Sequence, residues 1–179
     1  MSSRWMHAPC ALVALALLAT AVPAASPPAA RLRIGTYDSR VVALAYYRSP
    51  RGQQLVERLR ADLAQARQAK DEKQIAALER EGPALQNLMH QQVFGDLSIP
   101  NVLAAVSDSL PAVASRAGVS LLVSKWELRG ASTDAELVDV TPQMVALFAV
   151  DGATRQMLEE SMKHPQPPIA VERLLDPME

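Results

Sequence analysis

The chain has 179 residues, and its 18 Lys and Arg residues almost balance its 19 Asp and Glu residues, which leaves a net charge of −1. This balance argues against the strongly basic surfaces that gather nucleic acid or anionic lipid. An aromatic content of 4% likewise argues against a stacking platform for bases or sugars. We expect one domain with a modest core and no nucleic-acid partner.

The first 24 residues are expected to be an export signal. Arg4 supplies a positive charge, and residues 11–21 form an apolar run too short to span a bilayer. Small residues at the two positions that a signal peptidase reads, within residues 22–24, then predict cleavage after residue 24. An uncleaved N-terminal anchor is the alternative. Cleavage would leave a soluble periplasmic chain without cysteine, with a net charge of −2 and without any further membrane span.

The next segment leads into a short strand and a helix. Residues 25–31 are rich in Pro and Ala, and we expect them to be a disordered lead-in. Residues 32–37 alternate apolar with polar or small side chains, which predicts a strand. Asp38 and Ser39 offer capping oxygens for a buried helix over residues 40–47.

A helical arm is predicted over residues 49–118. Ser49 followed by proline is a helix start, and the charged residues 70–73 are typical of an exposed turn between two limbs. The Gly-Pro pair at residues 82–83 predicts a break or kink in the returning limb. Another helix is expected over residues 100–117, with a glycine as its C-cap.

The apolar stripe of the arm is the main candidate binding surface. Packing of the two limbs against each other is the simpler explanation of such a stripe. However, two limbs cover each other on one side only, so leftover apolar surface could hold a client or a sister subunit. The two uses are not exclusive. The candidate contact residues are Leu55, Leu59, Leu63, Ile75, Leu78 and Leu85.

Two further strands follow the arm. Residues 119–124 are rich in β-branched residues and leucine, and residues 136–140 form a second apolar run after a turn near residues 130–134. Adjacent strands joined by a turn predict an antiparallel hairpin. The predicted fold class is therefore α+β, with a small antiparallel β-sheet, a long helical arm inserted after the first strand, and C-terminal helices.

The C-terminal part is predicted to be helical and then Pro-rich. Helices are expected over residues 143–148 and 151–163. The domain should therefore extend over residues 32–164. Residues 165–179 contain four prolines, which predicts a loose end or a strap along the surface.

Trp126 is a second candidate partner-binding site, apart from the arm. Tryptophan is enriched at interface centres, and here it lies between Lys125 and Glu127 at the end of a predicted strand. The alternative is that Trp126 covers the small core, with its N–H bonded to the backbone.

An exported hydrolase is the least supported hypothesis. It would use the carboxylates of Asp38 and Asp139, which end two predicted strands, together with His90. Both acids also precede predicted helix starts, where negative charge is favourable, and a lone histidine on a helix surface is common. We therefore predict no enzyme, no catalytic residues, no metal and no cofactor. No Gly-rich phosphate loop is present to bind a nucleotide.

The order of elements resembles the Skp/OmpH family of periplasmic chaperones over residues 32–148. I-G-T-Y-D-S-R-V-V at residues 34–42 resembles the family's opening strand, whose aspartate precedes a short helix. S-P-R-G at residues 49–52 resembles its entry into the arm, and residues 114–123 resemble its descent into the second strand. D-V-T-P-Q-M-V at residues 139–145 resembles its closing strand and helix.

The resemblance implies a β core that forms a trimer, with arms that enclose a cavity for unfolded outer-membrane proteins. The expected function is therefore that of an exported cell-envelope holdase, which shields apolar segments with its arms and uses no nucleotide. The alternative is an envelope scaffolding or interaction protein that binds one folded partner and has no chaperone activity.

Overall fold

The computed structural model describes residues 31–130 and 134–169. The expected export signal, nearly all of the lead-in, most of the expected turn near residues 130–134 and the tail beyond residue 169 lie outside the described residues. None of the helices described is both long enough and apolar enough to cross a membrane.

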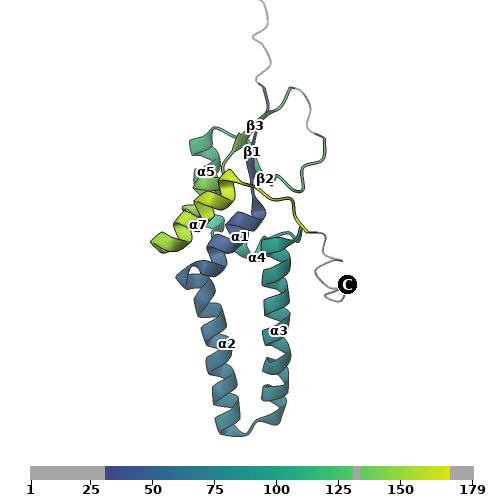
Figure 1. Cartoon of the computed structure of the whole chain (residues 1–179), viewed down its shortest axis with the longest axis vertical. Helices are drawn as coiled ribbons and strands as arrows, with labels where there is room; N and C mark the ends of the chain where they lie inside the picture. Colours follow the sequence, from purple (N-terminus) through teal and green to yellow (C-terminus); the bar gives the residue numbers. More distant parts are fainter. Residues whose placement is uncertain (1–30, 131–133, 170–179) are drawn as a thin grey trace, which may run out of the picture. The chain divides into compact units, whose positions relative to one another are not determined.

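The described residues form three strands, seven α-helices and one short 3-10 helix (Figure 1). In chain order they are β1 (Arg33–Tyr37), α1 (Ser39–Arg48), α2 (Pro50–Ala69), α3 (Glu72–Phe94), α4 (Pro100–Ala104), η1 (Ser107–Ser109), α5 (Leu110–Ala117), β2 (Leu121–Ser124), β3 (Glu136–Asp139), α6 (Thr141–Val145) and α7 (Gly152–Lys163).

The sheet is parallel throughout, so the prediction of a small antiparallel sheet is wrong. β1 is the central strand, with β2 on one edge and β3 on the other. Ile34 of β1 is paired with Leu121 of β2 and with Leu137 of β3 in parallel register. The fold nevertheless combines helices with a three-stranded sheet, as an α+β protein does.

The error has a physical cause. Alternation of apolar residues predicts a strand but not its partner, and a short connection between two strands favours a hairpin. A parallel crossover needs about a dozen residues, and the connection between the end of β2 at Ser124 and the start of β3 at Glu136 is about that long. The connection from β1 to β2 contains α1 and the entire helical arm. The arm is thus part of the crossover between two parallel strands.

α1 lies at the centre of the core. Val42 and Ala45 of α1 are completely buried, and this helix contacts α2, α3, α4, α6 and α7. Val113 of α5, Met144 of α6 and Leu158 of α7 are also fully buried in the same cluster. A helix enclosed on nearly all sides is apolar on nearly all sides, which is the composition that predicted a buried helix here.

Several predicted helix boundaries are confirmed. The Asp38 carboxylate caps α1 by accepting from the backbone N–H groups of Arg40 and Val41. The Ser49 hydroxyl caps α2 by accepting from the N–H of Gly52. The tip turn uses Lys70 in the left-handed region (φ 56°).

Of the break or kink predicted at residues 82–83, the break is absent, because α3 continues through Pro83 as one helix. Pro83 lacks the N–H that would bond to the carbonyl of Glu79. The preceding Gly82 has no Cβ to collide with the proline ring, and this relieves the steric conflict that usually ends a helix before proline. The helix predicted over residues 100–117 is instead divided into α4, η1 and α5.

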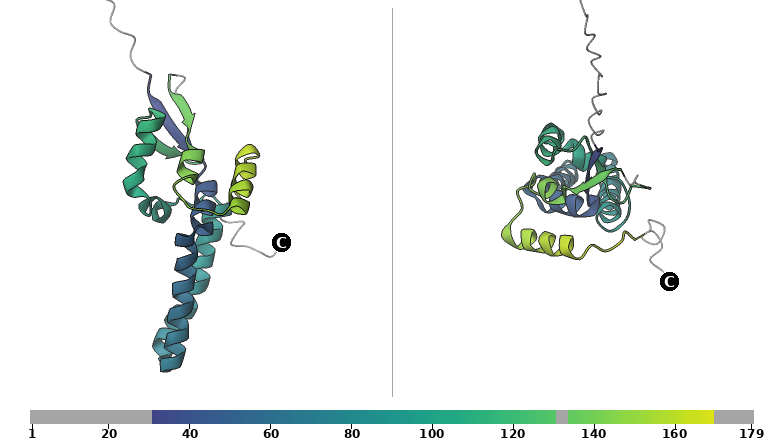
Figure 2. Two further views of the ribbon diagram at one scale, coloured as in Figure 1. Left: turned by 90° about the vertical axis from the view of Figure 1, so that its left-hand side faces the viewer. Right: turned by 90° about the horizontal axis from the view of Figure 1, so that it is seen from above.

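α2 and α3 lie side by side as the two limbs of the arm (Figures 1 and 2). The main contacts of α2 are with α1 and α3. At the root of the arm, the Tyr47 hydroxyl donates to Gln92 (2.6 Å), Gln92 donates to Asn101 (2.6 Å), and Asn101 donates back to Tyr47 (3.1 Å). This closed ring connects α1, α3 and α4. Burial raises the pKa of Tyr47, which keeps its hydroxyl protonated as a donor.

Gly52 lets α2 start directly against the end of α1. A Cβ at this position would lie 2.3 Å from the carbonyl oxygen of Tyr46 and 2.6 Å from the Cα of Tyr47. Both are backbone atoms, so the root of the arm would have to shift to admit even a methyl group.

We expect Gly52→Ala to lower the free energy of unfolding by roughly 1–3 kcal/mol, as overpacking does. Urea denaturation followed by circular dichroism measures this loss. Gly152→Ala is the matched control, because a Cβ at Gly152 meets nothing within 4 Å in α7. Equal effects of the two substitutions would contradict a steric requirement at Gly52.

Candidate functional site

An apolar hollow lies between the two limbs of the arm, and we call it the arm hollow. Its volume is about 390 Å³. Arg60, Glu79 and Gln86 are its polar lining residues. Its other lining residues are Val56, Leu59, Leu63, Leu78, Gly82, Pro83, Leu85 and Met89.

Four of the six arm residues predicted from sequence meet in this hollow. Leu59 and Leu63 come from α2, and Leu78 and Leu85 come from α3; all four are only half-buried. Leu55 lies apart, 39% exposed, in a separate hollow beside Tyr46. Ile75 is half-buried nearer the tip and does not line the arm hollow.

The sequence prediction omitted Val56 and Met89 from the site. Met89 follows Leu85 by four positions and Val56 precedes Leu59 by three, so helical spacing already placed both on the apolar stripe. No sequence signal, however, indicated that the limbs would leave a hollow instead of closing on each other. Closure does occur nearer the tip, where Ala66 of α2 is 1% exposed.

One face of the sheet is apolar and open, and we call it the outer sheet face. Side chains alternate along a strand, and paired parallel residues share a face. The face that carries Gly35 and Tyr37 packs on the core together with Leu122 and Val138. The opposite face carries Leu32, Ile34, Leu121, Val123 and Leu137, with the polar Thr36 and Asp139 in the same row as Val123.

Three residues of the outer sheet face are strongly exposed. Leu32 is 50% exposed, Leu121 41% and Leu137 46%. Parallel sheets are normally covered on both faces. Within the described part of the chain, this row of leucines therefore lacks the cover that such a sheet needs.

Trp126 binds a buried carboxylate instead of standing free at the surface. Its indole N–H donates to Asp38 Oδ1 at 2.9 Å, and Lys125 Nζ lies 2.8 Å from Asp38 Oδ2. The Arg40 guanidinium and the Lys125 ammonium lie 5.1 and 4.6 Å from the indole ring, within the range of cation–π attraction. The ring is half-buried, and its N–H bonds to a side chain, not to the backbone.

Asp38 is 2% exposed and is held as a carboxylate. Burial alone would raise its pKa. Hydrogen bonds from Lys125 and Trp126, and the positive charges of Lys125 and Arg40, outweigh burial and lower the pKa below its ordinary value. The charged form is therefore the one that the folded state stabilises.

The three residues of the hydrolase hypothesis do not converge. Asp38 and Asp139 lie at the same end of the sheet, where β1 and β3 both terminate, because these strands are parallel. However, the Asp139 carboxylate accepts from the Thr141 hydroxyl (2.6 Å), and that hydroxyl accepts from the backbone N–H of Asp38 (3.0 Å). His90 is on α3, where it stacks edge-on against Phe94. Among the described residues, no cluster of His, Cys, Asp and Glu could hold a metal ion.

Comparisons of the chain with protein-family models, with curated proteins and with solved structures found no significant match.

We expect Asp38→Asn to lower the free energy of unfolding by roughly 2 kcal/mol at pH 7, because Lys125 and Arg40 lose their buried counter-charge. The folded-state pKa of Asp38 is depressed, so its stabilisation is full above the unfolded pKa and is lost as the pH falls through the folded value. The difference between wild type and variant should therefore be constant near neutrality and shrink below about pH 4.

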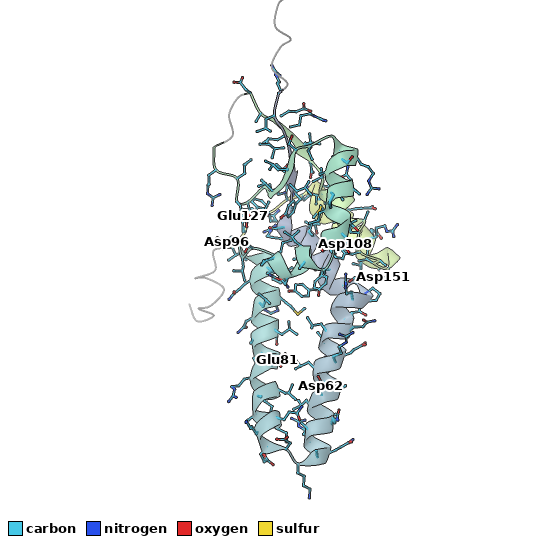
Figure 3. All side chains as sticks on the ribbon, turned by 180° about the vertical axis from the view of Figure 1, so that it is seen from behind. Asp62, Glu81, Asp96, Asp108, Glu127 and Asp151 are labelled. Atoms are coloured by element: carbon cyan, nitrogen blue, oxygen red, sulfur yellow. The ribbon has the colours of Figure 1, made fainter. Side chains whose placement is uncertain are left out.

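Urea titrations at several pH values, followed by circular dichroism, measure this difference. Asp62→Asn is the control, since Asp62 is exposed on α2 (Figure 3). A stability difference between wild type and Asp38→Asn that does not change down to about pH 2 would contradict an ionised Asp38 in the native state.

Proposed function

We propose that this protein is an exported binding protein of the cell envelope that shields apolar segments of unfolded polypeptides, as its resemblance to the Skp/OmpH chaperones implies. The arm hollow is the observation that carries this proposal. Leu59, Leu63 and Leu85 remain half-buried although a second limb lies beside them. Apolar surface that remains partly exposed between two helices favours an extended apolar segment as its ligand.

The electrostatics of the hollow suit such a ligand. Arg60 and Glu79 at the hollow have opposite charges, and the rest of the lining is apolar apart from one glutamine. A groove without a dominant charge selects for apolar side chains and not for a particular sequence. This is the selectivity that a holdase for unfolded outer-membrane proteins requires.

We further propose that the protein forms a homo-oligomer, a trimer by the resemblance, through its outer sheet face. The exposed Leu32, Leu121 and Leu137 support this proposal, because an apolar parallel face requires a cover. Sister subunits would also place several arms around one client, and linked weak sites bind more tightly than one.

The arm prediction is tested by suppression of aggregation. An unfolded outer-membrane protein is diluted from urea, and light scattering is recorded in the presence of residues 25–179. We expect the double variant Leu59→Gln, Leu85→Gln to need about thirtyfold more protein for half-maximal suppression, because each of the two leucines contributes on the order of 1 kcal/mol of apolar contact.

The matched control is Ala61→Gln with Ala84→Gln, which places the same side chain on exposed positions of the same two helices. Circular dichroism must first show equal helix content in both double variants. If wild type itself fails to suppress aggregation and instead captures one folded partner stoichiometrically, the chaperone proposal is wrong and the scaffolding alternative replaces it.

The sheet prediction is tested by solution mass. We expect Leu137→Lys to convert an oligomer of residues 25–179 into monomers, because a lysine cannot be desolvated in the centre of an apolar interface without a partner. Size-exclusion chromatography with light scattering gives the mass directly. Leu55→Lys is the control, since Leu55 is similarly exposed but lies on the arm. A monomeric wild type would refute assembly through this face.

A further inference from the structure

A second hollow lies where the arm joins the C-terminal part, and we call it the strap hollow. Its walls come from α1 (Arg40, Val41 and Leu44), from the end of α3 (Val93 and Phe94) and from α7 (Ser161). Residues 165–169, which we call the strap, run from α7 to the end of α3 in Figure 1 and contribute Gln166, Pro167 and Ile169 to the remaining border. The volume is about 320 Å³, roughly twice that of a protein cavity that holds benzene.

One backbone hydrogen bond attaches the strap. The N–H of Ile169 donates to the carbonyl oxygen of Phe94 at 2.9 Å. The carbonyls in the last turn of a helix have no partner within that helix. The end of α3 therefore offers an acceptor to any extended chain that passes, and here the chain's own strap takes it.

The strap borders the hollow but does not fill it. Phe94 remains 52% exposed and Ile169 46% exposed, and open volume persists between α1 and Pro167. The described residues end at Ile169, so the next residue of the chain begins at the rim of the hollow.

We propose that the strap hollow is the docking site of residues 170–179 of the same chain. This segment, A-V-E-R-L-L-D-P-M-E, carries three aliphatic residues (Val171, Leu174 and Leu175) that match the apolar wall of Val41, Leu44 and Val93. Six residues span up to about 20 Å, so Leu175 can reach every wall of the hollow from Ile169.

Charge also favours this occupant. Arg40 is the charged residue of the lining, and its Nε lies 3.8 Å from Asp38 Oδ1. Asp38 is shared by Arg40 and Lys125, so this group of three carries one surplus positive charge. Residues 170–179 contain three acidic residues and one arginine, and so have the complementary sign.

The proposal is tested first by adding the segment in trans. A fluorescein-labelled peptide of residues 170–179 is titrated with a chain that ends at Ile169, and binding is followed by fluorescence anisotropy. We expect saturable binding to the shortened chain and about tenfold weaker apparent binding to the full-length chain, in which the attached segment competes at high effective concentration. Removal of residues 170–179 deletes no contact described above.

Two matched variants of the shortened chain locate the site. Phe94→Ala should weaken peptide binding severalfold, because it removes an exposed aromatic wall of the hollow. Asn87→Ala, about two turns earlier on the exposed side of α3, should leave binding unchanged. Absence of saturable binding to the shortened chain, or equal binding to both chain lengths, would overturn the proposal.

A crosslink in the full-length chain distinguishes the chain's own segment from that of a second copy. The only native cysteine, Cys10, lies in the expected signal, so residues 25–179 with Leu44→Cys and Leu175→Cys have two thiols. We expect mild oxidation to give an intrachain disulfide, and Asn87→Cys paired with Leu175→Cys to give much less. A crosslink that forms mainly between chains would mean that a second copy occupies the hollow, which contradicts docking within one chain.

Discussion

The ends of all three strands are held together through Asp38. Its backbone N–H donates to Thr141 after β3, its carboxylate caps α1, and the same carboxylate binds Lys125 and Trp126 after β2. A buried carboxylate is tolerated only where such partners neutralise it and satisfy its lone pairs. The parallel arrangement supplies these partners, because the C-terminal ends of parallel strands lie at the same end of the sheet. If β3 were antiparallel, Thr141 would lie at the opposite end of the sheet from Asp38.

Local sequence signals predicted the elements well, and long-range pairing poorly. The aspartate and serine caps at Asp38 and Ser49 and the turn at Lys70 depend on a few neighbouring residues, so the sequence alone locates them. Strand direction depends on contacts between residues such as Ile34 and Leu137, which no periodicity reveals. Pro83 shows the same limit, because the tolerance of α3 for a proline depends on the missing Cβ of the preceding Gly82.

The candidate binding surfaces show the same difference between what local sequence signals predict and what depends on long-range contacts. Helical spacing identified the leucines of the arm, but whether two limbs close or leave a hollow depends on their separation, which side-chain pattern does not fix. Leu59 and Leu85 therefore had to be placed by the structure. The outer sheet face escaped prediction altogether, since the exposed side of Leu121 and Leu137 follows from the parallel register. Trp126 was identified as unusual, but its partner lies 88 residues away in sequence.

Because the arm lies within the crossover between β1 and β2, the topology constrains the order in which contacts can form. Contacts between the limbs are local; the Arg67–Glu79 ion pair joins residues only 12 positions apart. The sheet, by contrast, brings together groups such as Ser39 and Ser124, which are 85 positions apart. Closing a loop of that length is entropically costly, and contacts of high sequence separation form slowly. A helical hairpin formed early shortens the effective loop and brings β2 back towards β1. The topology therefore favours formation of the arm before the pairing of β2 with β1.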